Sequence, residues 1–137
     1  MNSPDSQRLQ EVYRREFRSL LQYARGSAPY ATGADRTILD SVMRIATEEA
    51  TDLEAFGELL DKNRITLPYL GSYPMGFTDL NFVTIRHLLP KLIAEQKRDL
   101  AKLEAEIPEY TDVIARAAMQ RLAELHRRHL KELEALG

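Results

Sequence analysis

The stretch 64-RITLPYLGSYPMGFT-78 links two segments of helical periodicity and decides how the rest of the chain can pack. It contains two prolines and two glycines: Pro68, Pro74, Gly71 and Gly76. These residues exclude a continuous helix through the link. The helix expected before it, at 35–62, would be roughly 42 Å long at 1.5 Å per residue. Fifteen extended residues reach roughly 50 Å. The link is therefore long enough to start the next helix from the far end of the preceding one.

Apolar periodicity and stop signals predict four helices. They span about 4–25, 35–62, 78–106 and 109–136. Thr78 is expected to cap the third helix, whose apolar stripe starts at Phe82, and Pro108 to begin the fourth. Short links join helices one and two, and helices three and four, which makes each pair antiparallel.

The expected fold is all-α: one four-helix bundle domain over 1–137, made of two antiparallel hairpins joined by a long crossover between helices two and three. The alternative is a large surface loop between antiparallel helices. Apolar residues of the link, including Ile65, Leu67 and Phe77, favour a crossover that packs along the bundle.

Composition narrows the functional classes. The chain has 137 residues, with 44% apolar and 29% charged residues, as in ordinary globular domains. A net charge of −2 gives no electrostatic case for nucleic acid, so no nucleic-acid partner is expected. The absence of cysteine excludes disulfides and thiolate metal sites. The polar start MNSPDSQRLQ shows no signal peptide and no long apolar run is present, so we expect a cytoplasmic protein without membrane contact.

Polar residues interrupt the apolar stripe of every expected helix. They are Glu16 in the first helix, Glu49 and Asp52 in the second, Glu95 and Gln96 in the third, and His126 and His129 in the fourth. Buried charges are normally paired or bound to metal, so one interruption per helix predicts a shared polar site. Carboxylate and imidazole ligands suit iron, manganese or zinc. Residues three apart share a helix face, so Glu49 with Asp52, and His126 with His129, could each direct two ligands at one centre.

With these residues, the sequence resembles the ferritin-like superfamily, and most closely its bacterioferritin-type four-helix bundles. In the first helix, Glu16 followed by Gln22 and Tyr23 is similar to the family's ligand Glu followed by Gln-Tyr. The other positions that match ligands of the family are Glu49, Asp52, Glu95, His126 and His129. Asp52 replaces a histidine and His126 replaces a glutamate of the family pattern. By helical angle, Gln96 rather than Glu95 faces the core, which would remove one carboxylate and would suit a single metal ion or none.

The resemblance implies iron oxidation, iron storage or metal-dependent redox protection, with iron, or manganese or zinc, as the partner ion. It implies a catalytic role for Tyr23, and no haem, because Ala50 stands where the family has its haem-ligating methionine. Because the chain ends at Gly137 after the fourth helix, we expect a homodimer or small homo-oligomer rather than a cage.

The same residues allow a metal-free interpretation. His126 and His129 could form a closed hydrogen-bond network with Glu16 and Glu49, in a bundle kept as a structural or protein-interaction module. In that case Glu95 and Asp52 would lie at the surface or at the edge of the core. Tyr23 would then be a core-packing residue.

Overall fold

The computed structural model describes residues 1–27, 29–81 and 83–137, and it is all-helical, as the sequence predicts. Five α-helices follow in order: α1 (Ser3–Phe17), α2 (Leu20–Ser27), α3 (Asp35–Lys62), α4 (Ile85–Glu106) and α5 (Val113–Leu136). Two short 3-10 helices, η1 (Met75–Leu80) and η2 (Ile107–Glu109), lie in the links. No strand occurs in the described ranges, where one isolated bridge pairs Tyr30 with Thr84.

The first expected helix is divided into two, which corrects the prediction of one helix over 4–25. The backbone N–H of Arg18 donates to the carbonyls of Arg15 and Glu16 and closes α1. Ser19 follows, and its Oγ accepts a hydrogen bond from the backbone N–H of Gln22 at 3.2 Å. Ser19 therefore caps α2, which is the role its short hydroxyl side chain favours.

The third helix begins seven residues later than expected. Its N-cap is Thr84, whose side chain accepts from the backbone N–H of His87, and not Thr78, which lies within η1. The expected stripe position Phe82 falls outside the described residues. The last helix begins at Val113 with Asp112 as its N-cap, while Pro108 lies in η2.

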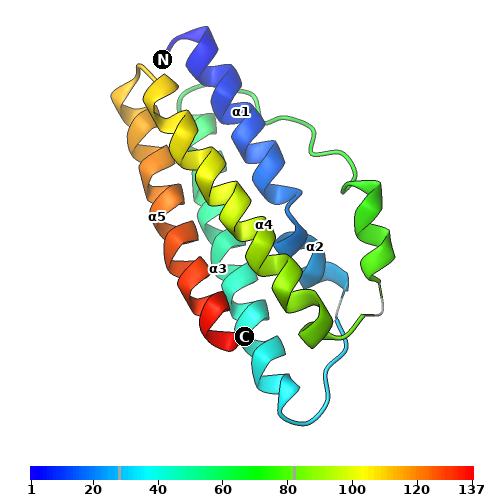
Figure 1. Ribbon diagram of the computed structural model, residues 1–137. Helices are drawn as coiled ribbons and strands as arrows, with labels where there is room; N and C mark the ends of the chain where they lie inside the picture. Colours follow the sequence, from blue (N-terminus) through cyan, green and yellow to red (C-terminus); the bar gives the residue numbers. More distant parts are fainter. Residues whose placement is uncertain (28, 82) are drawn as a thin grey trace.

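The direction of the helices follows from Figure 1. The chain runs down through α1 and α2, up through α3, up again through α4 and down through α5. The helix α1 packs against α3, and α4 packs against α5, so each pair is antiparallel. Residues 63–81 and 83–84 run along the outside between the upper end of α3 and the lower end of α4. The link thus returns the chain to the end from which α3 started.

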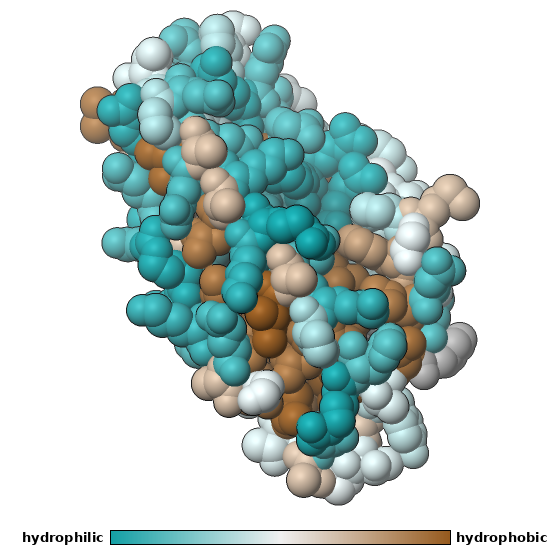
Figure 2. Space-filling model, in the orientation of Figure 1, coloured by the Kyte–Doolittle hydropathy of each residue, from teal (hydrophilic) through white to brown (hydrophobic). Residues whose placement is uncertain are grey.

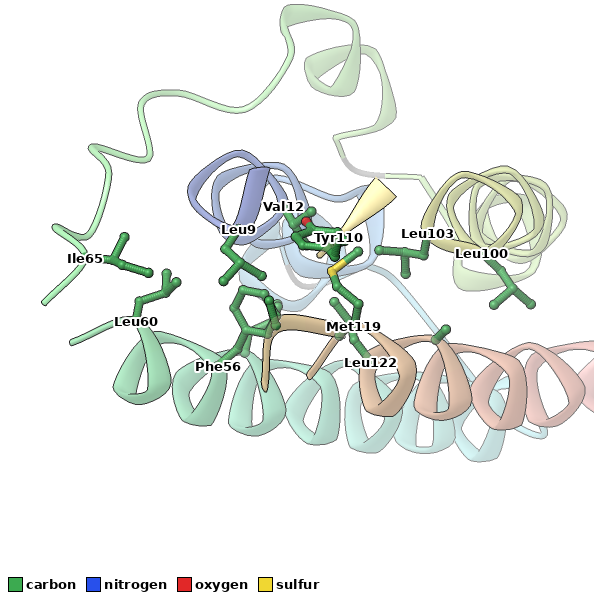
Figure 3. Close-up of a cluster of buried hydrophobic side chains, with 13 residues drawn as sticks. Leu9, Val12, Phe56, Leu60, Ile65, Leu100, Leu103, Tyr110, Met119 and Leu122 are labelled. Atoms are coloured by element: carbon green, nitrogen blue, oxygen red, sulfur yellow. The ribbon is translucent and has the colours of Figure 1, made fainter. Parts of the chain in front are cut away.

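Two hydrophobic clusters fill the interior. The upper one is drawn in Figure 3 and joins α1, α3, α4 and α5, with members such as Leu9, Phe56, Leu103 and Met119. The lower one joins α2, α3, α4 and α5, with members such as Leu21, Ile45, Leu88 and Leu133. In the view of Figure 2, hydrophobic surface gathers over the lower half of the molecule, while the upper half is mostly hydrophilic.

A buried carboxylate ties the start of α1 to the link before α5. Asp5 is fully buried, and its Oδ2 accepts hydrogen bonds from the backbone N–H groups of Thr111 and Asp112 at 3.2 and 2.8 Å and from the Thr111 hydroxyl at 3.0 Å. Burial alone would raise the pKa of Asp5, but these hydrogen bonds outweigh it and lower the pKa. Across the part of the chain described, every helix is too short or too polar to traverse a lipid bilayer.

Candidate metal centre

A layer of buried polar side chains separates the two hydrophobic clusters. It consists of Glu16 from α1, Glu49 from α3, Gln96 from α4, and His126 and His129 from α5. On α3, α4 and α5, buried residues of one cluster precede this level and buried residues of the other follow it. On the N-terminal side, α1 contributes to the upper cluster and α2 to the lower one. The polar interruptions in the sequence therefore do converge at one height in the fold.

His126 is oriented by its own helix. Its Nδ1 lies 3.0 Å from the carbonyl oxygen of Leu122, and because a carbonyl can only accept, Nδ1 carries a proton and donates it. The other ring nitrogen, Nε2, faces carboxylate oxygens from three helices. It lies 2.8 Å from Glu16 Oε1, 3.1 Å from Asp99 Oδ2 and 3.5 Å from Glu49 Oε1. A backbone carbonyl on Nδ1 with carboxylates around Nε2 is the arrangement that metal-binding histidines commonly use.

Glu16 presents one oxygen to this cluster and the other to a cation. Its Oε2 accepts from Arg15 Nε at 3.2 Å. Its Oε1 is buried and, within the described ranges, accepts no hydrogen bond of ordinary geometry despite lying 2.8 Å from His126 Nε2. Buried acceptors are rarely left in this state, so Oε1 is a position that a shared proton or an ion could satisfy.

Asp99 on α4 completes the cluster, and the sequence analysis missed it. Ligand atoms of Glu16, Asp99 and His126 all lie within 4.8 Å of one another. A signal was present, because Asp99 is three residues after Gln96 and four before Leu103, and so lies on the same stripe. This signal is weak, because α4 carries many other charged residues.

The ionisation of the cluster follows from its burial. Burial and the adjacent Asp99 carboxylate raise the pKa of Glu16 to about 8. Burial would lower the pKa of His126, but the carboxylates of Glu49, Asp99 and Glu16 outweigh it and raise the pKa well above 6.5. Burial would raise the pKa of Asp99, but hydrogen bonding with Glu16 and His126 and the charge of Arg15 lower it. Without metal, the cluster at neutral pH holds a carboxylic acid, a carboxylate and an imidazolium.

His129 belongs to a neighbouring network. Its Nδ1 lies 2.8 Å from Glu49 Oε2, and its Nε2 lies 2.7 Å from Glu48 Oε2. Burial opposes the charged ring, but the two carboxylates raise the pKa of His129. Gln96 Nε2 also donates to Glu49 Oε2 at 2.8 Å, so that oxygen is fully used by the protein. Both nitrogens of His129 are likewise engaged, which leaves it without a lone pair for metal.

Three residues of the expected site lie elsewhere. Glu95 is at the surface, paired with Arg98, because Gln96 takes the inward position on α4. Asp52 sits at the edge of α3, with Oδ1 3.8 Å from Arg121 Nη2. Tyr23, the expected catalytic residue, packs against Tyr73 and Phe77 of the crossover and hydrogen-bonds Asn81.

The donor set fits one metal ion and not two. A dinuclear site of the ferritin-like type takes a carboxylate from each of two helices and a carboxylate–histidine pair from each of the others. Here the second inward position of α4 is the amide of Gln96, and His129 is held by Glu48 and Glu49. One imidazole with two or three carboxylates remains, and these are donors that iron, manganese and zinc accept.

The cluster can be reached from outside. A pocket of about 260 Å³ lies where α1, α2, α4 and the crossover meet, and its walls include Glu16 and Asp99. The Asp99 side chain keeps 19% of its surface exposed, whereas Glu16 and His126 are buried. An ion held here would keep one side open to solvent.

No protein-family model, curated protein or solved structure significantly matches this chain. Its function therefore has to be inferred from the geometry of the polar layer.

Proposed function

We propose that this chain is a ferritin-like four-helix bundle, with α1 and α2 together forming its first helix, that holds a single divalent metal ion of the iron, manganese or zinc class. Glu16, Asp99 and His126 are the ligands, and Glu49 lies close enough to act as a fourth. The observation that carries this proposal is the arrangement around His126, whose Nδ1 is committed to Leu122 while Nε2 faces carboxylate oxygens of other helices.

The distances between the donor atoms suit a single ion, as their chemistry does. Zinc–ligand bonds of roughly 2.1 Å place donors of a single ion at most roughly 4.2 Å apart. The distances from Nε2 to Glu16 Oε1 and Asp99 Oδ2, 2.8 and 3.1 Å, lie inside this limit. Protons on Glu16 and His126 would have to leave when the ion enters.

With iron bound, the reaction class would be oxidation of Fe(II) by dioxygen or peroxide, in iron handling or redox protection. The contributions of this chain are then to fix the carboxylates of α1 and α4 against His126 and to leave the side facing the pocket open. Arg15 holds Glu16 Oε2 at 3.2 Å and lies 3.7 Å from Asp99 Oδ1, so it orients both carboxylates. Tyr23 has no part in this proposal, because its contacts are with the crossover.

A second candidate is a metal-free bundle that serves as a structural or interaction module. The observation that favours it is the pairing of both ring nitrogens of His129 with Glu48 and Glu49, which leaves this histidine no open position for an ion. Arg15 likewise supplies positive charge beside Glu16 and Asp99.

Metal titration separates the two candidates. Protein stripped with a chelator is titrated with Fe(II) under anaerobic conditions, and with Mn(II) and Zn(II), and bound metal is measured by mass spectrometry after gel filtration. One ion per chain, lost in His126→Gln and kept in the surface control His87→Gln, is the expected result. Binding of none of the three metals would leave the metal-free module as the better description.

A further inference from the structure

An apolar groove runs between α3 and α5 on the outside of the molecule, away from the polar layer. It has a volume of about 490 Å³. Its lining includes three small side chains, Ala55 on α3 and Ala117 and Ala118 on α5, beside the larger Phe56 and Leu59. Val113 and Ile114, at the start of α5, are 82% and 51% exposed beside it. Large apolar side chains exposed next to an apolar groove indicate a surface that another protein covers.

The charges around the groove are balanced. They are Asp52, Glu58 and Lys62 on α3 and Arg121 on α5, two acids and two bases. Two copies of this face therefore have no net repulsion, which would not hold for a surface of one sign.

The positions of these charges are also self-complementary. Asp52 and Lys62 are ten residues apart on α3, which places them roughly 15 Å apart along the axis. The midpoint between them falls at Gly57, between Phe56 and Glu58, which line the groove. A two-fold axis through this midpoint brings Lys62 of one copy opposite Asp52 of the other, twice in the same interface, as an isologous dimer requires.

We propose that this groove is the interface for a second copy of the chain, in which α3 and α5 of each copy pack antiparallel against those of the other. The alanines allow the helices to approach closely, and Val113 and Ile114 of one copy fill the partner groove. The proposal is independent of the metal centre, because none of the ligands lines the groove.

The first test is the oligomeric state, measured by light scattering after gel filtration and by sedimentation over a range of concentrations. Wild type is expected to be a dimer. Ala117→Arg, an exposed position at the centre of the groove, is expected to be monomeric with unchanged helical circular dichroism. Ala101→Arg, at an exposed alanine of α4 outside the groove, is the matched control and should remain dimeric. A monomeric wild type, or a dimer that survives Ala117→Arg, would overturn the proposal.

The second test checks the two-fold register by charge reversal. Lys62→Glu and Asp52→Lys each place like charges opposite one another and should weaken self-association at least tenfold. An equimolar mixture restores opposite charges at both contacts, because Glu at 62 then meets Lys at 52 and Lys62 meets Asp52. The mixture should therefore form a heterodimer with an affinity near that of wild type. Two single variants that associate no better together than alone would exclude this arrangement.

Discussion

Oε1 of Glu16 lies 2.8 Å from Nε2 of His126, although the two residues belong to helices at opposite ends of the sequence. A buried carboxyl oxygen that accepts no aligned hydrogen bond thus lies next to the Nε2 of a ring whose Nδ1 already donates to Leu122. Such a pair can be satisfied by shared protons or by an ion. The predictions below distinguish these states.

Ligand variants should lose metal binding only where the structure places a ligand. Glu16→Gln and Asp99→Asn are expected to weaken binding by more than about 100-fold, because even changes to residues that only orient ligands cost roughly 10–100-fold. Glu95→Gln and Asp52→Asn are matched controls, since both residues lie outside the cluster. Calorimetric titration with Zn(II) measures the four affinities. Loss of binding in the control variants, with Glu16→Gln and Asp99→Asn intact, would contradict this site.

Without metal, the protein should become less stable as the pH rises. Glu16 has a folded pKa of about 8 against 4.5 for the free side chain, and the pKa of His126 is raised above 6.5. The folded state then binds more protons than the unfolded state, so the free energy of unfolding falls from about pH 4.5 through pH 8 and beyond. Urea unfolding of chelator-treated protein at pH 6 and pH 9 measures this, and Glu16→Gln should flatten the dependence.

The stabilisation that a bound metal ion gives should instead increase as the pH rises. Protons on Glu16 and His126 compete with the ion, so the rise in Tm caused by Zn(II) is expected to be larger at pH 8 than at pH 6. Thermal melts with and without the ion at both pH values test this. An equal rise at both pH values would mean that the ion binds elsewhere.

Gln96→Glu should destabilise the metal-free protein. Gln96 Nε2 donates to Glu49 Oε2 at 2.8 Å, and the substitution replaces this donor with a second buried acid. A loss of roughly 1–3 kcal/mol in the free energy of unfolding at pH 8 is expected, the usual cost of a buried group without its partner. Divalent metal should recover more stability in this variant than in wild type. Urea unfolding with and without Mn(II) measures both effects.

Asp5→Ala should destabilise the chain through the docking of α1. The substitution removes an acceptor for the backbone N–H groups of Thr111 and Asp112 and for the Thr111 hydroxyl. A loss of roughly 2–3 kcal/mol is expected from the donors left behind. Asp40→Ala, at an exposed position of α3, is the control and should change stability by less than about 0.5 kcal/mol.

The long periodic helices were predicted well from the sequence, whereas the residues at which helices begin and end were predicted less well. The helix at 35–62 was predicted with the bounds it has, because its apolar stripe continues for several turns on both sides of Glu49. The break at Ser19 was missed, since the apolar pattern continues across it from Phe17 to Leu20 and only the hydroxyl side chain marks the cap. The start of α4 was placed too early because Thr78 and Thr84 are both of a residue type that caps helices; Thr84 is the cap, and Thr78 lies within η1.

The candidate site was predicted in outline and corrected in detail. Glu16, Glu49 and His126 were expected to converge and do so, because they interrupt apolar stripes near their middle. Asp99 could not be separated from the other charged residues of α4 without the positions of neighbouring helices. Glu95 was matched by its position in a family pattern, whereas the angle around α4 turns Gln96 inward.

The crossover has a consequence for the order of folding. Glu16 and Glu49 lie on the hairpin of α1 and α3, whereas Asp99 and His126 lie on the hairpin of α4 and α5. Each hairpin can form from contacts that are fairly close in sequence, but the cluster needs both, and distant contacts form late. A half-docked chain would hold Glu16 and Glu49 on one side and Asp99 and His126 on the other, so neither side would hold the complete cluster. The rate at which metal binds during refolding would therefore report the rate at which the two hairpins dock.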